Sequence, residues 1–440
     1  MNELVSRVSA WLDEIEPIEV QGAVSQLVGL IVEANGPAAS VGDLCEIYLR
    51  DGRRLSAEVV GFRENRILLM PLGRLEGICP GDKVVSLQQQ LKVTVGEHLL
   101  GHVVDGLGRP LSRNILKVAG ETRPLIAMPP DPLQRPRIRS VLATGVRAID
   151  GFLTLGFGQR VGIFAGSGVG KSVLLGMIAR ESEADVNVIA LVGERGREVN
   201  DFLERDHGPE GLSKSVVVIA TSDQPAILRV KCGLTAMAIA EYFRDQGKNV
   251  MFMMDSVTRI ALSLREIGLA IGEPPTTKAY TPSVFAFLPQ LLERAGTAAK
   301  GSITGIFTVL VEGSDMEDPI ADAVRSILDG HIVLSRHLAE QKQFPAIDIL
   351  QSISRLMNEI VQPEHLKAAN ELAALLAIYK NSEDLINIGA YVRGNNKELD
   401  VAVEKHSRTI EFLKQDFRDT THITETIGQM IKLTHKGANT

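Results

Sequence analysis

The chain contains few cysteines and few aromatic residues. Only three cysteines occur in 440 residues, Cys45, Cys79 and Cys232, and none lies in a C-x-x-C or other zinc-binding spacing. Their odd number argues against a disulfide framework and fits a reducing compartment. Aromatic side chains make up 4% of the sequence, so the stacking platforms on which proteins bind single-stranded nucleic acid are scarce.

The sequence also lacks an excess of positive charge and any long apolar run. Its net charge of −7 provides no large cationic field, so no nucleic-acid partner is expected, although a local basic patch can exist under a negative total. No uncharged stretch of about 20 apolar residues occurs, and the N-terminus has no basic region followed by an apolar one. We therefore expect a cytoplasmic protein whose membrane contact, if any, is peripheral or through partners.

The length and the 45% of hydrophobic residues allow about three domains with ample cores. Residues 1–17 are expected to form an amphipathic helix that either packs on its own domain or docks on a partner or membrane surface. Its apolar side chains recur at helical spacing: Leu4, Val8, Trp11 and Ile15. Residues 18–90 hold short β-branched runs between turn signals, which predicts a small barrel. Its role is expected to be structural and ring-forming rather than oligonucleotide-binding, because Tyr48 and Phe62 are its only large aromatics.

The rest of the chain is expected to form an α/β domain over 91–350 and a helical domain over 351–440. Residues 91–120 are glycine-rich and are expected to form a loop-rich bridge, and residues 121–140 are proline-rich and are expected to cross in a stiff, extended form. The arginines of that crossing are expected to be solvated or paired with carboxylates rather than bound to phosphate. Apolar strands then alternate with helical patterns, which is typical of a mostly parallel sheet.

The sequence is organised around the stretch GIFAGSGVGKS. The apolar run 160–164 predicts a buried strand, and a helical pattern follows the glycine-rich turn. This order is typical of a P-loop, whose backbone N–H groups cradle phosphates. The predicted loop residues are Gly166, Ser167, Gly168, Val169, Gly170, Lys171 and Ser172. Ala165 replaces the leading glycine of the motif, so a plain strand–turn–helix is the alternative at this point.

Two carboxylates follow other predicted strands. Asp255 ends an apolar run, where it can either orient Mg²⁺ beside the phosphate site or cap a helix. Glu194 follows the strand 187–193, where ATP hydrolysis would need a group that aligns the attacking water. The neighbouring Arg195 can bind a γ-phosphate or pair with a carboxylate. The histidines show no metal-binding spacing, and no Ser–His–Asp arrangement is apparent.

Together these motifs resemble a known family. The runs FAGSGVGKSVLLGMIAR, GERGREV, DGHIVLSR and FPAIDILQSISR are similar to those of the rotary-type hexameric ATPases related to the catalytic subunit of F-type ATP synthase. The resemblance is greatest to the ATPases of flagellar and virulence type III secretion, and it covers nearly the whole chain. It implies a RecA-like P-loop ATPase core with an N-terminal β-barrel and a C-terminal helical domain. It also implies a homohexamer that hydrolyses ATP with Mg²⁺ to energise flagellar protein export, with an injectisome ATPase as the alternative.

The resemblance implies roles for individual residues. The nucleotide-binding set is Gly166, Ser167, Gly168, Val169, Gly170, Lys171, Ser172, Val173, Phe344 and Tyr391. Phe344 stands where relatives often have tyrosine, and its ring keeps the face that stacks on adenine. The catalytic set is Lys171, Glu194, Arg195 and Arg355, of which Arg355 reaches a neighbouring subunit's site. The Mg²⁺ ligands are Ser172 and, through water, Asp255 and Glu198.

The resemblance further implies partners and a location at the inner face of the cell membrane. The partners are a stator-like regulator at the N-terminal helix, a central coiled-coil stalk protein, export gate membrane proteins, and export substrates with their chaperones. Two positions depart from the family pattern: Ala165 in the P-loop and Ser314 in EGSDMED. A non-catalytic ring subunit is disfavoured by Glu194. An RNA translocase is disfavoured by the acidic balance and the few aromatics.

Overall fold

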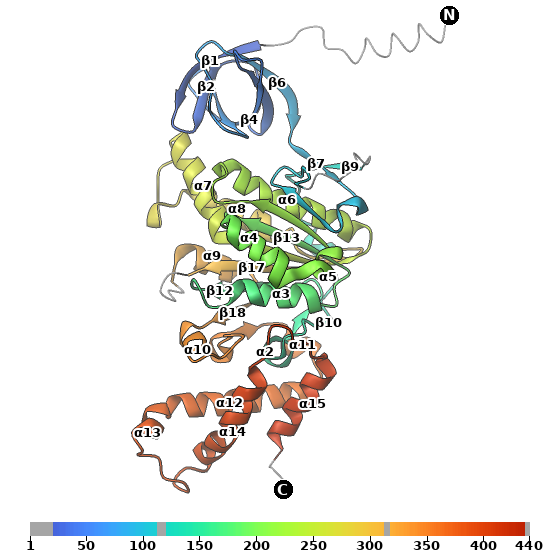
Figure 1. Cartoon of the computed structure of the whole chain (residues 1–440), viewed down its shortest axis with the longest axis vertical. Helices are drawn as coiled ribbons and strands as arrows, with labels where there is room; N and C mark the ends of the chain where they lie inside the picture. The colour runs from blue at the N-terminus through green and yellow to red at the C-terminus, as the bar shows by residue number, and fades with distance from the viewer. Residues whose placement is uncertain (1–20, 112–119, 312–316, 436–440) are drawn as a thin grey trace, which may run out of the picture. The chain divides into compact units, whose positions relative to one another are not determined.

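The computed structural model describes residues 21–111, 120–311 and 317–435 (Figure 1). The predicted N-terminal helix and Ser314 lie outside the described residues. Among the residues described, no helix is both long enough and apolar enough to cross a membrane.

The chain divides into two compact units. The first holds the chain up to Lys92 together with Glu266–Pro274, and the second holds Val93–Arg265 and Pro275 onwards. The three-part architecture that the sequence predicts is present as a barrel, an α/β core and a set of C-terminal helices. The predicted domain boundaries themselves stay predictions.

The first unit contains a closed barrel, as predicted. Within the described residues its strands follow the order β1-β2-β5-β4-β3-β6. In chain order these are β1 (Gln21–Val28), β2 (Ile31–Asn35), β3 (Asp43–Tyr48), β4 (Arg54–Arg63), β5 (Arg66–Pro71) and β6 (Lys83–Gln90). Side chains alternate between the two faces of each strand, so the β-branched residues of every strand can fill the interior. The fully buried set includes Val32, Ile47, Val59, Leu69 and Val84.

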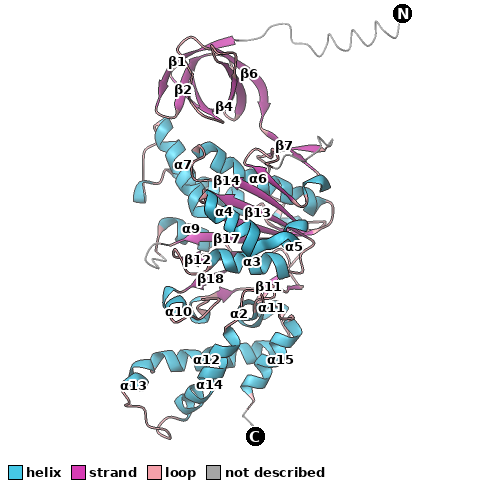
Figure 2. Cartoon of the chain, in the orientation of Figure 1, coloured by secondary structure: helices cyan, strands magenta, loops and turns pink. Residues whose placement is uncertain are grey.

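The second unit is built on a mostly parallel sheet, as predicted (Figure 2). The order of the described strands is β19-β18-β12-β17-β15-β13-β14-β8, with β16 paired to β17. The bounds are β8 (His102–Asp105), β12 (Arg160–Ala165), β13 (Val186–Val192), β14 (Ser215–Ala220), β15 (Asn249–Asp255), β16 (Gly296–Thr297), β17 (Ser302–Leu310), β18 (Gly330–Leu334) and β19 (Ile353–Ser354). Only β16 and β19 pair antiparallel among them. Strands such as β13 are buried along their whole length, which explains their unbroken apolar sequence.

Helices connect these strands and form the end of the chain. The helices around the sheet are α2 (Arg147–Phe152), α3 (Lys171–Glu181), α4 (Gly196–Asp201), a π-helix (Phe202–His207), α5 (Gly208–Ser213), α6 (Ala226–Asp245), α7 (Val257–Ile271), α8 (Pro282–Leu292), α9 (Pro319–Ile327), α10 (Arg336–Glu340) and α11 (Met357–Ile360). The C-terminal helices are α12 (Pro363–Asn381), α13 (Glu383–Asn387), α14 (Lys397–Leu413) and α15 (Ile423–Thr434). Both α14 and α15 pack on α12, so the predicted helical end is confirmed.

The prediction that residues 91–120 form a loop-rich bridge is wrong in part. Within that range β8 joins the edge of the main sheet, where it pairs parallel with β14. The strand β7 (Lys92–Val95) pairs with β9 (Glu121–Pro124) in a separate two-stranded sheet, and β10 (Val141–Leu142) pairs with β11 (Leu155–Gly156). These pairings join residues that are distant in the sequence. The flanking glycines indicated loops, so the strands were not predicted. In the proline-rich crossing, Arg123 pairs with Glu121 and Asp245, which agrees with the expectation for its arginines.

Candidate active site

The glycine-rich turn lies between β12 and α3, at the carboxyl edge of the sheet. Gly168 and Gly170 have φ values of 77° and 90°, which a residue with a Cβ rarely adopts. Gly170 is the N-cap of α3 and offers no side-chain cap, so the first N–H groups of the helix are left for another acceptor. Ala165 is the last residue of β12 and has no positive φ, so no glycine is required there.

Three charged side chains meet beside this turn. The Lys171 ammonium contacts Oδ1 of Asp255 and lies 3.7 Å from Oε1 of Glu194. Lys171 begins α3, Asp255 ends β15, and Glu194 follows β13, so three separate elements deliver them. Parallel strands place their carboxyl ends at one edge, which is why the sequence could associate Glu194 and Asp255 with the P-loop. All three side chains are at most 11% exposed.

Two further residues in this cluster were missed by the sequence analysis. Arg259, in the first turn of α7, places Nε 3.2 Å from Oε1 of Glu194. Thr308, buried in β17, donates a hydrogen bond of 2.7 Å from Oγ1 to Oδ1 of Asp255. The position of Arg259, four residues after the strand-ending Asp255, was a usable signal. Thr308, one of two threonines in a mostly apolar strand, gave no such signal.

The electrostatics of Glu194 suit a group that exchanges protons near neutral pH. Burial is the largest influence and raises the pKa of Glu194 to about 7. The contact with Glu198 and the negative charge of Asp255 raise this pKa as well, whereas the two cations Lys171 and Arg259 lower it. The same contact lowers the pKa of Glu198, which therefore stays ionised. A general base works best when its pKa lies close to the operating pH.

Arg195 lies next to Glu194 but belongs to a more exposed part of the site. It is the N-cap residue of α4, and its side chain is 79% exposed. Its Nη1 lies 3.7 Å from Oε1 of Glu198, one turn along the same helix. The structure therefore places Arg195 and Glu198 together at the rim of the cluster, and their roles toward phosphate and Mg²⁺ stay predictions.

A pocket of about 520 Å³ opens beside the P-loop. Its lining includes Val173 from α3, Phe344, and Phe417 from the chain after α14. Ring atoms of Phe344 lie 3.6 Å from the point where a Cβ would stand on Gly170, so the ring packs against the loop. A largely apolar pocket with aromatic side chains beside the glycine-rich loop suits an adenine base. Phe417 was not singled out in the sequence.

Tyr391 does not line this pocket. It lies in the loop between α13 and α14, where its hydroxyl donates a hydrogen bond of 2.6 Å to Asp400. The backbone N–H of Gly394 donates to the same carboxylate at 2.9 Å. The predicted role of Tyr391 near the adenine therefore gains no support from its contacts in this structure, and it stays a prediction.

Arg355 lies at the opposite edge of the sheet from the P-loop. It directly follows β19, which pairs with the first residues of β18, and its backbone N–H donates to the carbonyl of Asp329 at 3.1 Å. The P-loop follows the last residue of β12 instead. Six residues of strand span about 20 Å, which is longer than an arginine side chain. The structure thus does not bring Arg355 to the P-loop of its own chain.

The donor set fits a magnesium ion held largely by nucleotide phosphates. Such an ion keeps several waters and takes only one or two protein ligands. No cluster of three or more His, Cys, Asp or Glu side chains with metal-binding geometry occurs among the described residues. Ser172 in the first turn of α3 and Asp255 beside Lys171 are the side chains that would hold the ion.

Comparisons with known proteins agree with this geometry. The family model of the ATP synthase alpha/beta nucleotide-binding domain matches residues 145–354, and the model of the family's β-barrel domain matches residues 24–88. A flagellum-specific ATP synthase of Bacillus subtilis (strain 168) is 56% identical over 94% of this chain and 95% of its own length. The chain belongs to the ATP synthase alpha/beta family. Within that family, the model of the type III secretion EscN ATPase C-terminal domain matches residues 361–432.

Solved structures of family members extend the likeness to three dimensions. The assembled ATPase EscN from the type III secretion system of enteropathogenic E. coli has a TM-score of 0.88 and 49% identity, over 94% of this chain and 99% of that one. EscN in complex with its central stalk EscO gives a TM-score of 0.87 and 49% identity, with the same coverage. The predictions of the fold and of an ATPase in the flagellar and type III secretion branch of the family are therefore confirmed.

Proposed function

We propose that this chain hydrolyses Mg-ATP as a homohexameric ring that energises protein export through the flagellar type III secretion apparatus. The observation that supports a ring is the position of Arg355, about 20 Å along β12 from the chain's own P-loop. Only another copy of the chain can then supply the arginine to a site. The relative EscN is described as an assembled ATPase, which agrees with this proposal.

Each side chain at the carboxyl edge has a part in the proposed reaction. Glu194, with a pKa of about 7, orients the attacking water and takes its proton. Lys171 supplies a cation to the phosphate oxygens, and its contact with Asp255 holds the ammonium at the start of α3. Bound Mg²⁺ would neutralise phosphate charge beside Ser172 and Asp255. Arg355 of a neighbouring subunit stabilises the charge that develops on the transferred phosphoryl group.

The flagellar machine is favoured over an injectisome by the relatives. The flagellum-specific protein of Bacillus subtilis is 56% identical to this chain, whereas the type 3 secretion system ATPase of Xanthomonas euvesicatoria is 50% identical. The margin is small, because a solved ATPase from a type III secretion system is 54% identical over 79% of this chain. We expect that deletion of the gene abolishes motility and leaves secretion through any injectisome intact. Normal motility together with failed injectisome secretion would establish the alternative.

The proposed partners follow from the relatives and from the resemblance. EscN binds a central stalk, so a coiled-coil stalk protein is the first partner proposed for this ring. A stator-like regulator, export gate membrane proteins, and export substrates with their chaperones complete the set. Through these contacts the ring would be held peripherally at the inner face of the cell membrane, on its cytoplasmic side.

The dependence of ATPase rate on protein concentration tests the proposal. Because two chains complete each site, the rate per chain should rise with concentration and level off once rings have formed. The variant Lys171→Ala serves as the background control. A rate per chain that stays constant from the monomeric to the ring-forming range would contradict a shared site.

A further inference from the structure

Gln159 is a fully buried amide at the base of the P-loop strand. Its Oε1 accepts a hydrogen bond of 2.9 Å from the backbone of Gly156. Its Nε2 donates to Oγ of Ser354 at 3.0 Å and to the carbonyl of Asp329 at 3.4 Å. One side chain thus joins the segment before β12, the turn before β18, and the residue that precedes Arg355.

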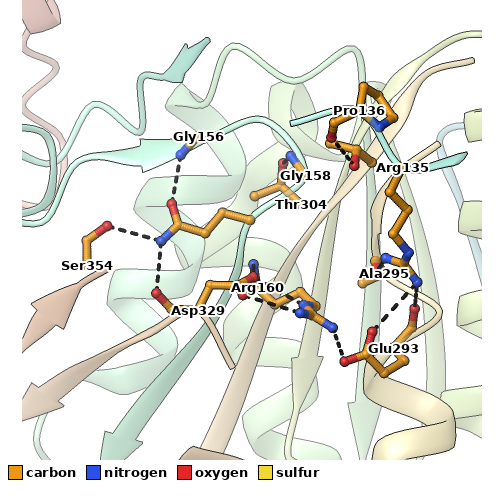
Figure 3. A network of polar contacts seen from close by, with 12 residues as sticks. Arg135, Pro136, Gly156, Gly158, Arg160, Glu293, Ala295, Thr304, Asp329 and Ser354 are labelled. Carbon is orange, nitrogen blue, oxygen red and sulfur yellow. Dashed lines mark hydrogen bonds and ion pairs between the residues drawn. The ribbon is translucent and has the colours of Figure 1, made fainter. Parts of the chain in front are cut away.

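A second set of contacts binds the same turn to β12 (Figure 3). Arg160 donates to the Asp329 carboxylate from its backbone N–H at 3.0 Å, from Nε at 3.1 Å and from Nη2 at 3.2 Å. The other side of the Arg160 guanidinium lies 2.6 Å from Oε1 of Glu293. Glu293 is in turn close to Arg135 of the proline-rich crossing. The base of β12 is therefore fixed on several sides.

The carbonyl oxygen of Asp329 is the point at which these contacts reach Arg355. It accepts one hydrogen bond from the backbone N–H of Arg355, at 3.1 Å, and a second from Nε2 of Gln159. The hydroxyl of Ser354 also donates to the carbonyl of Thr154 at 2.9 Å. The residue before Arg355 and the Arg355 backbone are thereby both anchored, while the Arg355 side chain is exposed.

We propose that Gln159 is a positioning residue for Arg355, which it holds at a fixed place relative to the P-loop strand of the same chain. The inference rests on the proposed function, in which Arg355 serves the neighbouring site. An arginine that acts on a neighbouring subunit's site must be held at a fixed position on the surface of its own subunit. A displacement of about 1 Å is enough to cost up to about 10²-fold in rate.

The variant Gln159→Met tests this inference, because methionine keeps much of the volume and removes both amide functions. In assembled rings the variant should lower kcat by about 10-fold and leave the KM for ATP near its wild-type value. Arg355 would contribute mainly in the transition state, so its displacement should spare ground-state binding. In the Arg355→Ala background, Gln159→Met should cause no further loss of kcat, since the arginine it positions is already absent.

Asn187 provides a matched control. It is another fully buried amide, and its Nδ2 donates to the Ala179 carbonyl at 2.7 Å and to Oγ of Ser215 at 3.2 Å. It has no contact with the Arg355 segment among its hydrogen bonds. Any loss of kcat in Asn187→Leu should therefore be the same with and without Arg355, because that loss would reflect general stability. If Gln159→Met behaves in the same additive way, the inference is overturned.

A smaller change keeps the test valid if Gln159→Met does not form rings. Ser354→Ala removes only the hydroxyl between Gln159 and Thr154, and Ser354→Thr restores it. The alanine variant should lower kcat in an Arg355-dependent manner, and the threonine variant should recover most of it. An equal loss with and without Arg355 would overturn the inference alone. If Arg355→Ala itself leaves kcat unchanged, the proposed shared site fails, and the inference fails with it.

Discussion

The two ends of strand β12 differ in how their polar groups are paired. At the carboxyl end, Oε1 of Glu194 is buried and accepts no well-formed hydrogen bond from the described residues, although cations lie 3.2 and 3.7 Å away. At the amino end, the Asp329 carboxylate accepts three hydrogen bonds from Arg160. The Glu194 carboxylate is thus incompletely paired, whereas the Asp329 carboxylate is fully engaged, although Nη1 of Arg160 in the second network also lacks a well-formed hydrogen bond.

Under the proposed function, this difference separates a reacting end from a positioning end. A buried carboxylate with a raised pKa and too few partners is typical of catalytic groups, which must change their protonation state. A buried amide and an ion pair with several hydrogen bonds favour one conformation instead. On this account each chain carries one half of a site at each end of β12, and neighbouring copies in a ring bring the halves together.

Replacement of the reacting carboxylate should have the largest effect of the single changes at the carboxyl end. Glu194→Gln keeps the shape of the side chain and removes the base, so kcat should fall by about 10²-fold or more while ATP still binds. Steady-state hydrolysis and nucleotide binding by the same rings measure the two quantities. Glu210→Gln, an exposed change on α5, is the control and should be neutral. Near-normal turnover of Glu194→Gln would contradict a catalytic role for the carboxyl end of the sheet.

Loss of the ring beside the P-loop should have an intermediate effect. Phe344→Ala removes a face on which adenine would stack, so the KM for ATP should rise by about 10-fold with a smaller change in kcat. Phe344→Tyr keeps that face and should behave like the wild type. An unchanged KM in the alanine variant would show that the pocket lined by Phe344 and Phe417 does not hold the base.

The pH dependence should reveal the smallest effect. With a pKa of about 7, Glu194 is protonated at lower pH and cannot accept a proton, so kcat/KM should fall as the pH decreases through about 7. Arg259 is a cation that favours the carboxylate, and Arg259→Gln should therefore raise the pKa of Glu194 and move this limb to higher pH. If the fall of kcat/KM at low pH is not shifted in Arg259→Gln, or is still present in Glu194→Gln, then a group other than Glu194 causes it.

The sequence was sufficient for the parts of the site that lie in contiguous motifs or at strand ends. The P-loop is a single run of residues, and Glu194 and Asp255 stand at the ends of apolar strands whose carboxyl ends share one edge. The barrel and the parallel sheet were likewise evident from the spacing of apolar runs. Ala165 needed no glycine because it still belongs to the strand.

The residues that escaped prediction depend on contacts between distant segments. In the sequence, Thr308 is not distinguished from the other small hydroxyl residues of a mostly apolar strand. Its part in the site appears only when β17 pairs with β15, which brings its hydroxyl to Asp255. The hydrogen bonds of Gln159 are not evident from the sequence, because its partners Asp329 and Ser354 lie about 170 and 195 positions later and reach the start of β12 only in the folded chain. Strand β8 was hidden for the same reason, because its partner β14 follows more than a hundred residues later.

The most direct test of the shared site is complementation between two variants that are each strongly impaired. Lys171→Ala lacks a working P-loop but keeps Arg355, and Arg355→Ala keeps the P-loop but lacks the arginine. When the two are co-expressed in equal amounts, about a quarter of the interfaces in a randomly mixed ring combine an intact P-loop with an intact Arg355. The account predicts that ATPase activity returns to about a quarter of the wild-type rate. Mixed rings no more active than either variant alone would contradict it.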